Sequence, residues 1–162
     1  MVSPKSAERG EQCRMIARDG TVRYREPMFP SETAIVDIEV SRFSFVKRRP
    51  DGTVDFVAPF PSMFSYGSVA GSLAPDGDPQ DALIVGASPQ RGDRVEFPIW
   101  GEVRFIDGGI ADHKWVVGPR APRPWEWQSI AVFFRVYALA KRGLGCIRGA
   151  NGPTVFRGVQ QD

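Results

Sequence analysis

Frequent glycine and proline turns leave this chain of 162 residues little room for long helices. The sequence contains 17 glycines and 14 prolines, and several segments between them alternate apolar and polar side chains with the two-residue period of a β-strand. Helical periodicity is strong in one place, between Ile130 and Ala138, and Gly143 and Gly145 are expected to end that helix. The pattern predicts an α+β fold that is mainly β, an OB-like five-stranded β-barrel with flanking helices. The expected strands are 21–25, 35–40, 42–47, 53–57, 63–69, 82–85, 94–99, 101–106, 114–117 and 154–159.

The length suits one domain with a single core. Residues 1–33 carry little periodicity and are expected to form an N-terminal arm that is partly flexible, whereas 34–162 are expected to form the barrel domain. Cys13 and Cys146 lie far apart without a secretion signal, which indicates a reducing, cytoplasmic location. No apolar run is long enough to span a membrane. The net charge of +2, from 21 basic and 19 acidic side chains, argues against a nucleic-acid partner.

Two acidic turns are the most informative chemical feature of the chain. The first directly precedes the apolar run 82–85, and the second leads into Lys114. If the barrel brings the turns together, each pair of like charges at about 4 Å and an effective dielectric near 20 costs about 4 kcal/mol. The carboxylates would then hold protons, be diluted by water, or bind hard cations such as Mg²⁺. The carboxylates are Asp76, Asp78 and Asp81 in the first turn and Asp107 and Asp112 in the second.

The first turn has two other possible interpretations, an ordinary solvated turn and a calcium-binding loop. An ordinary solvated turn is a real alternative, because Asp, Gly and Pro all favour turns. A calcium-binding EF-hand loop does not fit, since Asp81 stands where that loop needs glycine and Ala87 where it needs glutamate. A hard-cation site therefore remains the functional hypothesis for the turn.

The first acidic turn and its flanks resemble the characteristic region of family I soluble inorganic pyrophosphatases. In that family a Tyr-Gly pair is followed by a short loop, the pattern D-G-D-P-x-D and an apolar strand, as in Tyr66–Val85 here. The resemblance extends upstream to 38–40 and downstream to 101–114 and 133–137, so that it covers roughly residues 34–140. The stretch around DGDPxD is highly specific, and the rest gains weight from its order and spacing.

The resemblance implies an OB-type barrel that binds several Mg²⁺ ions and hydrolyses inorganic pyrophosphate to two phosphates. The implied partner is a small phosphorylated or metal-chelated substrate rather than a nucleic acid or a membrane, and a homo-oligomer, a trimer or a hexamer, is expected. Asp78 matches the carboxylate that helps to deprotonate the attacking water, and Glu39 matches an outer-shell carboxylate. The other matches are Asp76, Asp81, Asp107 and Asp112 as metal ligands, and Lys114, Tyr66 and Tyr137 as donors to phosphate oxygens.

Three positive charges that the family uses to hold phosphate are missing at the expected positions. Each charge-assisted contact is worth about 1.5–3 kcal/mol, so their loss would reduce pyrophosphate turnover strongly. Two alternatives stay open: a tailoring enzyme that acts on an organic metal-chelated substrate, and a non-catalytic metal-binding scaffold. Arg135 is two residues from Tyr137 and is expected to face elsewhere on the helix. The departures from the family are Ser44, Val46, Phe56 and Ala138, and possible replacements are Lys47, Arg48 and Arg49.

Overall fold

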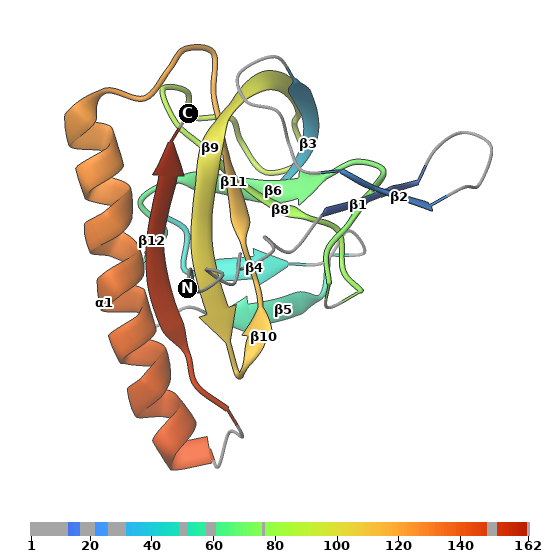
Figure 1. Ribbon diagram of the computed structural model, residues 1–162. Helices are drawn as coiled ribbons and strands as arrows, with labels where there is room; N and C mark the ends of the chain where they lie inside the picture. The colour runs from blue at the N-terminus through green and yellow to red at the C-terminus, as the bar shows by residue number, and fades with distance from the viewer. Residues whose placement is uncertain are drawn as a thin grey trace, which may run out of the picture.

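The computed structural model describes residues 13–16, 22–25, 32–48, 52–57, 61–75, 77–148 and 152–161. These ranges contain twelve strands and one helix (Figure 1). In chain order the elements are β1 (Cys13–Ile16), β2 (Val22–Arg25), β3 (Thr33–Val40), β4 (Val46–Arg48), β5 (Val54–Val57), β6 (Ser65–Val69), β7 (Ser72–Leu73), β8 (Asp81–Ile84), β9 (Arg94–Asp107), β10 (Ile110–Ala111), β11 (Lys114–Val117), α1 (Pro124–Arg148) and β12 (Val155–Gln161).

Five strands form a closed circuit of hydrogen-bonded neighbours. β3 pairs with β6, β6 with β8, β8 with β11 and β11 with β9, and β9 returns to β3. The β8–β11 pair is parallel and the other four pairs are antiparallel. The predicted mainly β fold with an OB-like five-stranded barrel is therefore confirmed, although one helix rather than several accompanies it in the described ranges.

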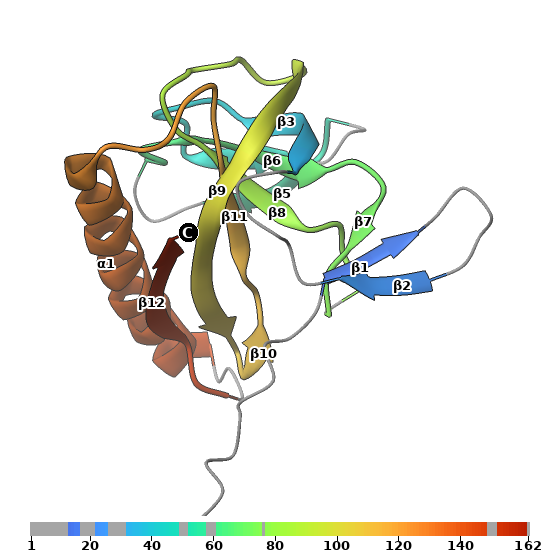
Figure 2. The same ribbon diagram turned by 45° about the horizontal axis from the view of Figure 1, so that its top comes forward.

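β9 closes the circuit because it is long enough to serve two neighbours. Its first part, 94–98, pairs with β3, and 99–103 pair with β11. The sequence suggested two strands here, whereas the structure has one strand that bends (Figure 2). β12 pairs along 101–106, and a Cβ at Gly101 would lie 2.3 Å from the carbonyl oxygen of Gln160. Glycine at that position therefore allows β12 to lie directly against β9.

Two apolar cores lie on the two sides of the barrel wall. Ala82 and Ile84 contribute to the core inside the barrel, whereas Leu83 and Val85 contribute to the core beneath α1. This alternation confirms that the continuous apolar run 82–85 is a strand buried on both faces. β12 lies between α1 and the outer side of β9 (Figures 1 and 2). The helix contributes Trp127, Ile130, Phe134 and Ala138 to the second core.

Helix α1 starts with a cap formed by its own first turn. The backbone N–H of Arg123 donates to Glu126 Oε2 over 2.7 Å, which satisfies a donor that the helix leaves open. Arg120 Nη1 and Nη2 donate to the two oxygens of the same carboxylate, over 2.7 and 2.9 Å. Pro124 occupies the first helical position, where its missing N–H is not needed. The cap fixes where the helix leaves the loop that follows β11.

Replacing Glu126 by glutamine should destabilise the protein at neutral pH but much less in acid. The hydrogen bonds from Arg120 hold the pKa of the Glu126 carboxyl below its usual value of 4.5, against the effect of burial. This contribution to stability is complete above the unfolded pKa and is lost as the pH falls through the lower folded pKa. We expect a loss of about 1 kcal/mol at neutral pH, because glutamine keeps an acceptor oxygen but loses the charge that strengthens the hydrogen bonds from Arg120. Urea unfolding at pH 7 and pH 3 would measure it, and equal losses at both pH values would contradict the assignment.

The predicted end of the helix at Gly143 and Gly145 is wrong. α1 continues to Arg148, and Gly143 lies within the helix with no positive φ. Each glycine costs about 1 kcal/mol of helix propensity, which does not end a helix whose apolar face is packed on β9 and β12. Within the described ranges, no helix combines the length and the apolar character needed to cross a membrane.

The expected hairpin over 42–57 forms, but its first strand starts later than predicted. β4 begins at Val46 and pairs with β5 in a separate two-stranded sheet. Before it, the N–H of Ser44 donates to the carbonyl of Ser41 over 3.0 Å, and Phe43 has a φ of 66°. Alternating side chains suggested a strand over 42–45, and a local turn replaces it. A further small sheet, in which β2 and β7 flank β1, lies on another side of the barrel (Figure 2).

Candidate active site

The two acidic turns meet at the start of the parallel strand pair of the barrel. Asp81 is the first residue of β8 and Lys114 the first residue of β11, and the two are partners in the register of that pair. Parallel strands begin at the same edge of a sheet, so the turn that precedes each strand lies at that edge as well. The predicted juxtaposition of these two segments therefore follows from a strand register.

Lys114 lies between carboxylates from both turns. Its side chain is 6% exposed, and its Nζ lies 2.8 Å from Asp81 Oδ2 and 2.6 Å from Asp112 Oδ1. Burial disfavours the charged lysine, but the nearby Asp81, Tyr66 and Asp112 outweigh it and leave the pKa of Lys114 well above its ordinary value. For Asp112, burial raises the pKa of the carboxyl against the attraction of Lys114. The ammonium group is thus a cation held at the point where the two turns converge.

Tyr66 completes this part of the site from β6. Lys114 Nζ lies 5.5 Å from the centre of the Tyr66 ring, within the range of a cation–π contact. Burial and the neighbouring Asp81 raise the pKa of the Tyr66 phenol well above its ordinary value. The hydroxyl therefore keeps its proton at neutral pH and can donate a hydrogen bond to an anion.

A second lysine joins the end of β9 to helix α1. Lys141 Nζ donates to Asp107 Oδ2 and lies 5.4 Å from the centre of the Tyr137 ring. The other carboxylate oxygen of Asp107 accepts a hydrogen bond of 3.1 Å from Thr154 Oγ1. Burial raises the pKa of Tyr137, and Lys141 and Lys114 oppose that shift. Asp107, Tyr137 and Lys141 therefore adjoin the group around Lys114.

Gln80 ties the two acidic turns together. Its side chain is buried, and its amide Nε2 donates to the backbone carbonyl of His113 in the second turn and, over 3.2 Å, to the carbonyl of Asp81. His113 Nδ1 in turn accepts a hydrogen bond of 3.1 Å from the N–H of Phe105 on β9. These contacts fix the spacing of the turns. Sequence reasoning missed Gln80, because a glutamine in a polar turn carries no signal that its amide reaches a distant carbonyl.

Gly67 explains why a glycine follows the tyrosine of the motif. It lies on β6 opposite Ile38 of β3, where a Cβ would be 2.1 Å from the carbonyl oxygen of Asp37. Any side chain at this position would push the two strands apart. Glu39 occupies the adjoining irregularity of β3, where the register shifts between Ile38 and Val40. The close approach of β3 and β6 therefore positions both Tyr66 and Glu39.

The remaining predicted site residues are Asp78, Glu39 and Asp76, and the structure describes the first two of them. Asp78 is exposed on the first turn, and its backbone carbonyl accepts a hydrogen bond of 2.7 Å from the N–H of Ala74. Glu39 is half-buried on β3. Asp76 lies outside the described residues. The described contacts thus bring together Tyr66, Asp81, Asp107, Asp112, Lys114 and Tyr137.

The donor set of this site suits a hard cation. Among the described residues no three His, Cys, Asp or Glu side chains are close enough to hold a metal ion by themselves. Two aspartates instead converge on the Lys114 ammonium, and a third holds the Lys141 ammonium. Carboxylate oxygens that already bind cationic groups are the ligand type that Mg²⁺ prefers, together with water. The residues present therefore fit Mg²⁺, with the lysines placed where they would meet a bound anion.

The family model for inorganic pyrophosphatase matches residues 53–144, more than half of the chain. The chain belongs to the inorganic pyrophosphatase family. The match includes both acidic turns, Lys114 and most of α1. No curated protein sequence matches the chain.

Solved pyrophosphatase structures have the same fold. The chain is 22% identical to an inorganic pyrophosphatase from Coxiella burnetii, with a TM-score of 0.65, over 80% of this chain and 86% of that one. It is 22% identical to the enzyme from Helicobacter pylori, with a TM-score of 0.65, over 86% and 91%. It is 24% identical to the enzyme from Thermus thermophilus, with a TM-score of 0.64, over 83% and 86%. At these identities the likeness concerns the fold.

The family assignment confirms the sequence-based interpretation of this chain as a divergent pyrophosphatase-type hydrolase. The family acts on pyrophosphate and depends on Mg²⁺. A tailoring enzyme and a non-catalytic scaffold, the two alternatives, are not favoured by these findings.

The phosphate side of the site retains the departures noted in the sequence. Ser44 Oγ contacts the N–H and the carbonyl of Val46, over 3.2 and 3.3 Å, and so takes part in the local turn. Ala138 is 4% exposed and packs in the core beneath α1. The side chains of Lys47, Arg48 and Phe56, and the whole of Arg49, lie outside the described part of the structure.

Proposed function

We propose that this pyrophosphatase-family chain hydrolyses inorganic pyrophosphate at the cluster around Lys114. A water oxygen attacks one phosphorus, the bond from that phosphorus to the bridging oxygen breaks, and two phosphates result. The observation that carries the proposal is the convergence of Asp81 and Asp112, from two separate turns, on one buried cation. Such an arrangement balances charge in a place where an anionic substrate and its cations must fit.

Each site residue has a proposed role that follows from its chemistry. Lys114, Tyr66 and Tyr137 donate hydrogen bonds to phosphate oxygens, and burial moves the pKa values of both phenols still further above neutrality. Asp78 accepts the proton of the attacking water, and Glu39 orients that region through water. Several Mg²⁺ ions held by Asp76, Asp81, Asp107 and Asp112 would acidify a bound water and offset phosphate charge.

The domain boundaries, the oligomeric state and the cellular location of the protein are part of the same proposal. We infer that residues 34–162 form the enzyme domain and that 1–33 are an arm added to it. A homo-oligomer, a trimer or a hexamer, is supported by the oligomeric habit of the family. A cytoplasmic location is supported by the two cysteines, which form no CxxC pattern. Gel filtration with light scattering would measure the assembly.

Phosphate release from pyrophosphate tests the function directly. We expect turnover with millimolar Mg²⁺ and none in EDTA. Asp78→Asn should lower kcat/KM about 100-fold, in the range typical of a lost general base. Because Asp78 is exposed, the variant should melt close to the wild-type temperature.

The matched control is Asp37→Asn. Asp37 is a half-buried aspartate on β3 whose carboxylate pairs with the exposed Arg94 outside the candidate site, so its replacement should leave turnover unchanged. A folded wild-type protein that releases no phosphate with Mg²⁺ would refute the proposed function. Wild-type turnover in Asp78→Asn would refute the role of that carboxylate.

A further inference from the structure

Position 138 lacks the positive charge that the family resemblance leads us to expect. The residue at this position, Ala138, is buried in an apolar environment. Ala138 packs against the apolar side chains between α1 and the barrel. A lysine three residues later, Lys141, reaches the candidate site and is 23% exposed. The chain therefore has a cation close to the position where the family resemblance calls for one, on a different helical turn.

The geometry of a helix allows Lys141 to occupy the space that a side chain from position 138 would reach. Residues three or four apart lie on the same face, and helical side chains lean towards the N-terminus. Lys141 thus leans back over Tyr137, 5.4 Å from the ring centre. Its Nζ bonds to Asp107, and Asp112 is near enough to act on it electrostatically. An aspartate and a tyrosine of the candidate site therefore contact this ammonium, and a second aspartate acts on it electrostatically.

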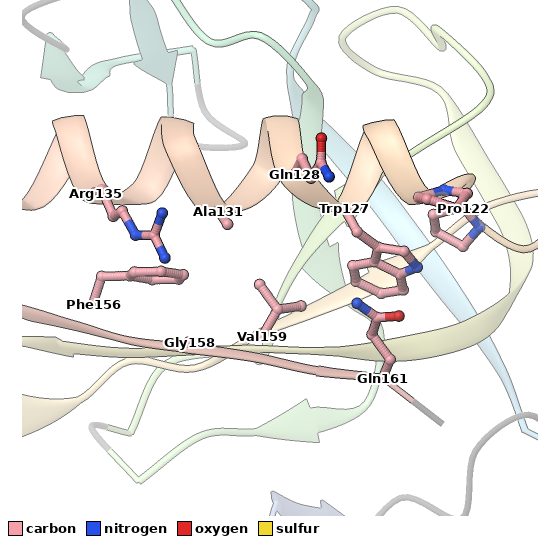
Figure 3. Close-up of a pocket in the computed structure, with 10 residues that line it drawn as sticks. Pro122, Trp127, Gln128, Ala131, Arg135, Phe156, Gly158, Val159 and Gln161 are labelled. Atoms are coloured by element: carbon pink, nitrogen blue, oxygen red, sulfur yellow. The ribbon is translucent and has the colours of Figure 1, made fainter.

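Other basic groups on the helix have different positions. Arg135 lies over the ring of Phe156 in the groove between α1 and β12, with Val159 beside it (Figure 3). Arg142 Nε donates to the backbone carbonyl of Thr154 over 2.6 Å and joins the helix to the start of β12. Among the basic residues of α1 whose side chains the structure describes, Lys141 is the one that contacts residues of the candidate site.

We propose that Lys141 donates to a phosphate oxygen of the bound pyrophosphate and supplies the charge that is missing at Ala138. A lysine ammonium has three donors, so it can keep Asp107 and bind an anion at the same time. The inference rests on the proposed function. Its alternative is a purely structural ion pair that joins the end of α1 to β9.

Lys141→Met separates these roles. We expect kcat/KM for pyrophosphate to fall about 30-fold, and the Kd of the non-hydrolysable analogue imidodiphosphate, measured by calorimetry with Mg²⁺, to rise about 10-fold. The melting temperature should stay near that of the wild type. Lys141→Arg should keep analogue binding within about threefold, because it keeps the charge. Arg135→Gln, a basic residue of the same helix outside the site, should match the wild type.

Each outcome decides one question. Unchanged turnover and unchanged analogue binding in Lys141→Met would overturn the inference. So would a loss of turnover with normal analogue binding, or losses that follow a lower melting temperature in both Lys141 variants. If the wild type binds imidodiphosphate but does not hydrolyse pyrophosphate, the proposed function fails, while weaker binding by Lys141→Met still supports the role of Lys141 in holding the anion.

Discussion

In the variant Lys114→Met, pyrophosphate turnover is expected to fall about a thousandfold. Lys114 Nζ is the cation between Asp81 and Asp112 and the proposed donor to a phosphate oxygen. A charge-assisted hydrogen bond is worth about 1.5–3 kcal/mol, and its loss together with the misplacement of two carboxylates reaches the roughly 4 kcal/mol that a thousandfold rate change requires. Methionine has nearly the same length, so the change removes the charge with little change in volume. Steady-state phosphate release measures the effect.

The same variant should become dependent on a divalent cation for its stability. Without the ammonium, Asp81 and Asp112 lose the counter-charge that lies between them at the rim of the barrel. Removing one partner of a largely buried ion pair costs about 3 kcal/mol at the lower end of the usual range. In EDTA the melting temperature should fall by about 10 °C, and millimolar Mg²⁺ should restore much of it, because a cation can replace the ammonium.

Arg94→Met is the control for this experiment. Arg94 also holds an aspartate, Asp37, but the Arg94 side chain is 67% exposed and the Asp37 side chain 44%, so the variant should keep its turnover and nearly its melting temperature. Turnover of Lys114→Met within threefold of the wild type would show that the buried lysine is not part of the machinery. Equal melting curves in EDTA and in Mg²⁺ would show that no cation takes its place.

Gly67→Ala is expected to destabilise the protein strongly, although it adds only one methyl group. The new Cβ would lie 2.1 Å from the backbone carbonyl oxygen of Asp37 and 3.0 Å from the Cα of Ile38. Neither backbone atom can move away without separating β3 from β6, so the cost should reach the upper range for overpacking, about 3 kcal/mol. For a chain of this length that lowers the melting temperature by about 10 °C. Turnover should fall too, because Tyr66 is the adjacent residue on β6.

A second glycine provides a matched comparison. Gly143 lies in α1, has no atom within 4 Å of a new Cβ and does not adopt a positive φ. Gly143→Ala should therefore stabilise the protein by about 0.5–1 kcal/mol, the usual difference in helix propensity. Chemical denaturation of both variants would measure the contrast. A Gly67→Ala protein as stable as the wild type would mean that β3 and β6 are farther apart than the structure has them.

Local patterns were enough to predict most of the fold. Alternation identified β3, the continuous apolar run 82–85 identified a strand buried on two faces, and the spacing from Ile130 to Ala138 identified the helix. Errors arose where tertiary contacts override local preference. Packing carries α1 through Gly143, and a turn at Phe43 interrupts an alternation that would suit a strand.

The candidate site was predictable where a motif is short and contiguous, and not where contacts are distant. The acidic turns and Lys114 lie within recognisable stretches. Gln80 and Lys141 have no such signal, because each has a hydrogen-bond partner in the site that lies more than thirty positions away. The alanine at position 138 indicates from the sequence that a positive charge is missing. That the Lys141 ammonium lies in the site can be seen only once α1 is placed against β9.

The distance between Asp81 and Lys114 depends on the pairing of β8 with β11 and not on the 33 positions of chain between them. Surface turns within that interval, such as the one at 90–93, can lengthen, shorten or change composition across evolution while the charges stay in place. Changes in such surface turns therefore do not alter the spacing of Asp81 and Lys114. Sequence drift as deep as that seen between this chain and its structural neighbours is therefore compatible with an inherited arrangement of charges.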